Sequence, residues 1–224
     1  MEYYDNGSGR RGIFSMLPPV TTHLIIINVI MFVATLINEN FMIGTFSMFY
    51  PASPFFRAWQ PLTHLFMYGG FFHIFFNMYS LFLFGTVVER TIGSKKFVVF
   101  YFLCGLGAML LHLLTMYISA DPLTQALTPM LGASGAIYGL FIAYGMLFPD
   151  SILTLVFPPV SLKAKWMMVI FVGIELVIGI ADAGSTGLSD GVAHFAHLGG
   201  AIFGFLLIFI WKKTGRIWLR DKWI

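Results

Sequence analysis

Residues 131–145 read LGASGAIYGLFIAYG. In this stretch one serine, Ser134, stands among small residues at the head of an apolar segment. Small residues and serine are ordinary packing material where membrane helices touch. The other interpretation makes Ser134 a nucleophile, with glycines that let a second helix approach it closely. The rest of the chain decides between the two.

The composition is typical of a polytopic membrane protein. Of the 224 residues, 58% are hydrophobic and only 10% are charged, and the mean hydropathy is +0.84. A soluble domain carries charge on roughly a quarter of its residues. The single cysteine, Cys104, excludes a framework of internal disulfides. No basic patch with interleaved aromatic residues lies away from the expected membrane ends, so we expect no nucleic-acid partner.

Six apolar segments are candidates for crossing a lipid bilayer, which takes about 20 residues as a helix. They lack the period-2 alternation of barrel strands, so they predict helices. The fourth and fifth segments are short for a full crossing. We therefore predict an all-α membrane protein with one six-helix domain, 20–212, between an N-terminal segment, 1–19, and a basic tail, 213–224. The expected spans are 21–42, 71–89, 97–119, 132–148, 165–182 and 191–212.

The basic residues predict the orientation of these spans. Twelve of the 13 Lys and Arg residues fall on one side, and only Arg57 falls on the other. Because cytoplasmic loops carry the excess of positive charge, we expect both termini in the cytoplasm. Arg57 lies in the outer loop 43–70, which is rich in aromatic residues. We expect this loop to combine an interfacial aromatic belt with a structured element beside a site.

Several polar residues fall in the outer half of the predicted bundle. His73 and Asn77 lie on one face near the outer start of the second span, because they are four residues apart. Ser134 lies near the outer start of the fourth span, and His197 in the outer half of the sixth. Polar groups in hydrocarbon are costly, so this shared depth indicates a site. Tyr138, one turn below Ser134, is positioned to pack on the His197 ring.

Glycines supply the means to bring Ser134 and His197 together. The fourth span carries two glycines four residues apart and the sixth span another two, patterns that permit close backbone approach. A histidine beside a serine is the minimum for an activated nucleophile. No Cys/His cluster has metal-ligand spacing, so we expect no metal and no organic cofactor. The residues expected to support the site are Gly132, Gly135, Tyr138, Gly200 and Gly204.

Other readings of the polar residues stay open. A lone serine in a membrane helix is more often packing material, and a lone histidine is as often structural as functional. No outer carboxylate has the spacing of a third member, so a Ser–His dyad is the simpler hypothesis. His112 and Glu175 fit no constellation, and the plainer interpretation of His194 is an interfacial neighbour of His197. Glu175 is either hydrogen-bonded within the bundle or proton-linked.

Four stretches resemble the motifs of the rhomboid intramembrane serine proteases. GASGAIYG at 132–139 is similar to the GxSG motif, and AHLGGAIFG at 196–204 is similar to AHxxGxxxG. HIFFNM at 73–78 resembles HxxxN. GTVVERTIGSKKF at 85–97 resembles GxxxExxxGS, whose glycines and glutamate are structural. The resemblance extends from about residue 20 to 212 and implies a six-transmembrane-helix rhomboid-type bundle.

The resemblance implies a role for each matching residue. Ser134 is then the nucleophile and His197 the base, while His73 and Asn77, with the Ser134 amide, hold the oxyanion. The implied partners are the lipid bilayer and single-span membrane proteins, cut within or beside their transmembrane helix. One departure is that Gln60 follows Trp59, where many rhomboids carry a Trp-Arg pair.

Two competing functions are weighed against a protease. A rhomboid-like pseudoprotease binds transmembrane helices without cutting, but such proteins usually lack the serine or the histidine. A transporter or channel predicts mid-membrane charges on several spans and an internal repeat. The sequence has one such acid, Glu175, and no convincing repeat. We expect a bacterial plasma membrane location, while the natural substrate and oligomeric state are not set by the sequence.

Overall fold

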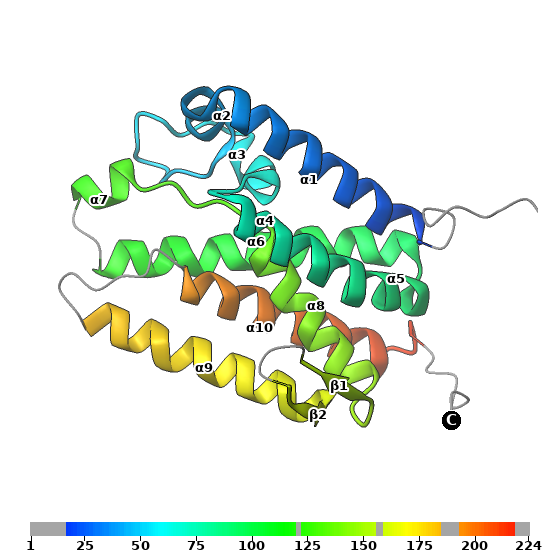
Figure 1. The fold of residues 1–224 in the computed structure, drawn as a ribbon. Helices are drawn as coiled ribbons and strands as arrows, with labels where there is room; N and C mark the ends of the chain where they lie inside the picture. Colours follow the sequence, from blue (N-terminus) through cyan, green and yellow to red (C-terminus); the bar gives the residue numbers. More distant parts are fainter. Residues whose placement is uncertain (1–16, 120–121, 156–158, 185–192, 218–224) are drawn as a thin grey trace, which may run out of the picture.

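The computed structural model describes residues 17–119, 122–155, 159–184 and 193–217. The predicted terminal segments therefore fall mostly outside the described residues. In the described ranges the chain is mostly helical and forms a bundle (Figure 1). The elements are α1 (Pro19–Ile37), α2 (Glu39–Phe46), α3 (Gln60–Thr63), η2 (His64–Phe66), α4 (Phe71–Ser80), η3 (Leu81–Gly85), α5 (Thr86–Ile92), α6 (Ser94–Ser119), α7 (Pro122–Leu127), α8 (Ser134–Leu147), β1 (Ile152–Thr154), β2 (Ser161–Lys163), α9 (Ala164–Gly184) and α10 (His194–Lys213).

Five helical segments in the described ranges are long and apolar enough to cross a membrane. They are Pro19–Ile37, Phe71–Ile92, Ser94–Ile118, Ala164–Asp182 and His194–Lys213. The apolar helix α8 is shorter, with 14 residues. The chain is thus an integral, multi-pass membrane protein.

Two expected spans differ from the observed helices. The fifth segment is not short, because α9 has 21 residues. The first ends at Ile37 rather than 42, because the Asn38 side chain accepts a hydrogen bond from the Phe41 amide (3.2 Å) and starts the separate helix α2.

The helices α6, α8 and α10 form the centre of the bundle and pack more extensively against one another than other pairs do. In Figure 1, α1 flanks this centre on one side and α9 on the other. The start of α1, the junction of α5 with α6, and the end of α10 lie at one end of the bundle, opposite α2, α3 and α7.

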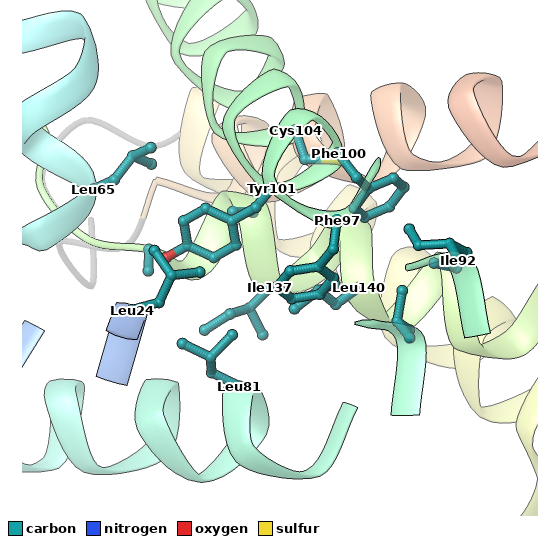
Figure 2. Packing of buried hydrophobic residues seen from close by; sticks show 14 of the residues in the cluster. Leu24, Leu65, Leu81, Ile92, Phe97, Phe100, Tyr101, Cys104, Ile137 and Leu140 are labelled. Atoms are coloured by element: carbon teal, nitrogen blue, oxygen red, sulfur yellow. The ribbon is translucent and has the colours of Figure 1, made fainter. Parts of the chain in front are cut away.

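The buried core is built around α6 (Figure 2). Phe97, Phe100, Tyr101 and Cys104 of α6 are fully buried and pack with residues of α1, α8 and η3. On the outside of the bundle, large apolar side chains such as Ile37 are exposed. Such a surface suits lipid, where exposing leucine or isoleucine costs little.

A buried carboxylate fastens α1 to the junction of α5 and α6. Glu89 accepts hydrogen bonds from the Thr21 amide (2.7 Å), the Thr21 hydroxyl (2.8 Å), the Val20 amide (3.0 Å) and the Ser94 hydroxyl (2.6 Å). The first amides of a helix lack intrahelical partners and carry partial positive charge, so a carboxylate there is favourable. Gly93 follows with φ of +83°, a conformation that glycine adopts at little cost.

The loop 43–70 is a structured element. The Gln60 side chain is fully buried, accepts from the amides of Arg57 (3.1 Å) and Phe49 (3.3 Å), and donates to the Phe55 carbonyl (2.9 Å). The Trp59 indole donates to the Thr45 carbonyl (2.9 Å). Gln60, which departs from the family pattern, therefore links separate parts of this loop to one another.

A short strand pair departs from the all-α prediction. β1 and β2 are antiparallel, with Ile152 opposite Lys163. The apolar stretch between α8 and α9 is too short for another span, and its exposed–intermediate–exposed pattern suits a two-stranded hairpin at the bundle surface.

Replacing Glu89 by glutamine is expected to lower the free energy of unfolding by about 2–3 kcal/mol, because an amide cannot accept from all four donors. Thermal unfolding in detergent measures the change. The control is Asp150→Asn, which removes exposed ion pairs to Lys163 (3.1 Å) and Lys165 (2.8 Å) and is expected to leave the free energy of unfolding almost unchanged, because water screens such pairs. Equal effects of the two variants would contradict the structural role of Glu89.

Candidate active site

Ser134 is the first residue of α8, and the chain reaches it in an unusual conformation. Gly132 has φ of +115°, in the region that L side chains rarely adopt. Its amide donates to the His64 carbonyl (2.9 Å). This turn places the serine hydroxyl at the N-terminus of α8, where the first backbone amides have no intrahelical partner.

His64, which holds that turn, is itself fixed. It is fully buried in η2, and its Nδ1 lies 2.9 Å from the Gln60 carbonyl oxygen, so Nδ1 carries the hydrogen and donates. Burial lowers the pKa of His64 to about 4, since the charged form loses its hydration. His64 therefore stays neutral near neutral pH, and the bond from its ring to Gln60 helps to fix the backbone that accepts from Gly132.

His197, one turn into α10, lies against the serine. Its Nε2 is 2.8 Å from Ser134 Oγ, a hydrogen-bond distance, and the histidine is 8% exposed. The contact depends on glycine packing between α8 and α10. A Cβ on Gly200 would lie 1.9 Å from the Gly135 carbonyl oxygen, and one on Gly204 would lie 2.7 Å from the α-carbon of Gly139. No larger residue fits at these positions.

The His197 ring is held between two other helices. The Tyr138 ring stacks on it, with centroids 4.4 Å apart and planes 9° from parallel. On the other side, Nδ1 of His197 lies 3.0 Å from Oε2 of Glu175 in α9. The N–H is poorly aligned with the carboxylate, so this contact is an electrostatic approach rather than a well-formed hydrogen bond.

Glu175 is the functional candidate that sequence reasoning left without a place. Its carboxylate accepts from the Tyr138 hydroxyl and from Nδ1 of His194 (2.7 Å), and its residue is 7% exposed. Of the two interpretations left open for Glu175, the structure shows hydrogen bonding within the bundle. The available signal was an acid within an apolar span, but no spacing links it to residues on other helices.

His73 and Asn77 are placed differently. A Cβ on Gly132 would lie 2.8 Å from His73 Nε2 and 3.8 Å from Ser134 Oγ, so the imidazole lies beside the serine turn. The Asn77 side chain is directed to its own helix, where its amide donates to the His73 carbonyl (2.7 Å). His112 lies in α6 and keeps no assigned role.

The cluster of Glu175, His194 and His197 has the donor set of a metal site, with ligand atoms within 4.8 Å of one another. Tetrahedral zinc with bonds of about 2.0–2.1 Å holds its ligand atoms roughly 3.3 Å apart. The observed spacings from the carboxylate oxygen to the two ring nitrogens, 2.7 Å and 3.0 Å, are shorter than this and are those of direct contacts. The arrangement therefore favours a hydrogen bond from His194 to Glu175 and an electrostatic contact with His197.

The comparisons with known proteins agree with the fold. A model of the rhomboid domain matches residues 56–214. RHOMBOID-like protein 1 of Arabidopsis thaliana is 28% identical over 154 residues, which cover 69% of this chain and 34% of the relative. The putative rhomboid protease YdcA of Bacillus subtilis (strain 168) is 27% identical over 154 residues, covering 68% and 66%. The rhomboid protease AarA of Providencia stuartii is 32% identical over 141 residues, covering 60% and 49%.

The fold and the site define a multi-pass membrane protein with a serine–histidine pair inside its helical bundle. The chain belongs to the rhomboid family, because the family model covers well over half of it. The chain spans about a third to two thirds of the length of the relatives named above.

Gly200→Ala is expected to destabilise the bundle by about 3 kcal/mol, because the new methyl group meets the backbone of α8, which cannot move aside like a side chain. Thermal unfolding in detergent measures the loss. Gly173→Ala in α9 is the matched control, since no atom lies within 4 Å of the added Cβ. A Gly200→Ala protein as stable as the control would contradict the close packing of α8 and α10.

Proposed function

We propose that the chain is an intramembrane serine endopeptidase that cuts membrane proteins within or beside their transmembrane helix. The observation that carries the proposal is the 2.8 Å contact of Ser134 Oγ with His197 Nε2 inside a membrane bundle. Two relatives are named as a rhomboid protease and a putative rhomboid protease, which supports the proposal.

The reaction follows from this pair. His197 Nε2 takes the proton of the Ser134 hydroxyl as the oxygen attacks the substrate carbonyl, and the protonated histidine then gives it to the leaving amine. The acyl-enzyme is hydrolysed by water, which His197 activates in the same manner. The Tyr138 ring stacked on the imidazole keeps its Nε2 directed at the serine.

Negative charge on the substrate oxygen needs donors in place before the reaction. The Ser134 amide is at the N-terminus of α8, where helix amides are unpaired and the helix dipole favours an anion. The His73 imidazole beside Gly132 is the second donor. Asn77 has a smaller share, because its amide already donates within α4.

The length of α8 supports a site below the membrane surface. Its 14 residues span about 21 Å at about 1.5 Å per residue, against a hydrocarbon core of about 30 Å. Its last turn lies near the basic end of the bundle, where the Lys212 ammonium donates to the Met146 carbonyl (3.1 Å). We place this end in the cytoplasm, so that α8 completes a six-span bundle and Ser134 lies about 9 Å below the opposite surface.

The substrate class follows from the site's position. A peptide bond in a stable helix is shielded, so a substrate helix has to unwind locally to reach Ser134. Single-span membrane proteins are the proposed substrates. A bacterial plasma membrane stays the expected location; the relatives come from bacteria, plants and the rat.

Ser134→Ala and His197→Ala are expected to abolish covalent labelling of the purified protein by a fluorophosphonate and cleavage of a model transmembrane substrate. The matched controls are Ser151→Ala and His23→Ala, which lie away from the site and are expected to label normally. A folded natural protein that neither labels nor cuts would contradict the proposal and favour a helix-binding pseudoprotease.

His73→Ala is expected to lower kcat by roughly 10²–10³-fold with little change in KM, because it removes an oxyanion donor used in the transition state. Asn77→Ala is expected to cost roughly 10-fold or less, since its amide bonds to the His73 carbonyl. Steady-state cleavage of a detergent-solubilised substrate measures both. A larger loss for Asn77 than for His73 would reverse the assignment of these donors.

A further inference from the structure

Glu175 lies near the middle of the membrane helix α9, where a carboxylate is costly. It is nearly buried and has donors on both oxygens: the Tyr138 hydroxyl on Oε1, and Nδ1 of His194 (2.7 Å) on Oε2. The same Oε2 lies 3.0 Å from His197 Nδ1. One side chain of α9 therefore contacts α8 and α10 at the proposed catalytic base.

The carboxylate decides which ring nitrogen of His197 carries the hydrogen. An ionised carboxylate only accepts, so Nδ1 facing it is the protonated nitrogen of the neutral ring. The other nitrogen, Nε2, then presents a lone pair to Ser134 Oγ at 2.8 Å. That tautomer is the one able to receive the serine proton.

We propose that Glu175 is a positioning residue of the catalytic centre, which holds His197 in the tautomer and orientation of a general base and stabilises the imidazolium. The inference rests on the proposed function and extends its Ser–His dyad to a Ser134–His197–Glu175 arrangement. The Glu175 carboxylate stays ionised throughout the reaction. The serine proton moves to Nε2, and Nδ1 retains its own.

The poor alignment of Nδ1–H with Oε2 in the resting state fits this role. The neutral ring gains little from the contact, whereas the imidazolium gains a full charge–charge attraction across 3.0 Å in surroundings of low dielectric constant. The carboxylate is thus worth more to the transition state than to the resting enzyme, which is the condition for raising the rate.

His194 keeps the carboxylate in place. It shares Oε2 through Nδ1, and its Nε2 lies 3.7 Å from Asp182 Oδ2 at the outer part of α9. The contact with Tyr138 fixes the other oxygen. With both oxygens held, Glu175 is oriented toward His197 without needing a strong hydrogen bond to it.

The test compares Glu175→Gln and Glu175→Asp with the natural protein in kcat, KM and thermal stability. Glu175→Gln presents an amide that favours the wrong tautomer, so kcat is expected to fall roughly 10- to 10³-fold with KM within about twofold. Glu175→Asp keeps the charge and is expected to recover part of kcat. Glu89→Gln is the matched control, since it makes the same change at a buried carboxylate far from the site and is expected to lose stability but keep kcat.

Each outcome decides between this inference and another reading. A natural protein that cuts and labels through Ser134, with kcat unchanged in folded Glu175→Gln, would overturn the inference and leave the proposed function standing. Loss of stability alone, as in Glu89→Gln, would make Glu175 a structural link. Loss of activity of the natural protein with a chelator would assign the cluster to a metal. An inert natural protein would remove the proposed function and the inference together.

Discussion

The close approach of α8 and α10 is the constraint on which the site depends. In lipid the hydrophobic effect does not press helices together, so van der Waals packing and polar contacts have to hold them. The glycines at 135 and 200 bring the two backbones so near that a Cβ on Gly200 would lie within 1.9 Å of a carbonyl oxygen. At that separation a serine on one helix reaches a histidine on the other. The small residues therefore act as helix-packing residues, and this same packing brings Ser134 and His197 into contact.

Two buried glutamates differ in the groups that donate hydrogen bonds to them, and these groups determine what each carboxylate can do. Glu89 accepts from two backbone amides and two hydroxyls, none of which ionises near neutral pH, so it acts as a fixed link between helices. Glu175 accepts from a tyrosine and lies against two histidines, groups that transfer protons. The same side chain at similar burial therefore serves assembly at one end of the bundle and, in our proposal, proton transfer near the other.

The sequence was enough to predict the features that depend on local pattern. Apolar length predicted the helices, and the shared depth of Ser134 and His197 predicted their neighbourhood. The sequence was not enough to predict contacts between residues of different helices, because no sequence spacing relates such residues. Glu175 is 22 residues from His197 along the chain, and its contact depends on how α9 rotates against α10. The direction of the Asn77 amide was also beyond prediction from spacing, because a side chain on a helix can bond to the backbone of the preceding turn.

Contacts with the loop 43–70 explain how α8 can begin inside the bundle. Backbone without helical hydrogen bonds is tolerated at membrane depth only where protein or water satisfies it. The stretch before Ser134 meets this condition through the loop 43–70, since Met130 pairs with Met48 (2.8 Å and 2.9 Å) and Gly132 donates to His64. Gln60 in turn holds the loop together from within. The aromatic-rich loop therefore supplies hydrogen-bond partners for the backbone before α8, donors and acceptors alike, so that α8 can begin inside the bundle with Ser134 at its N-terminus.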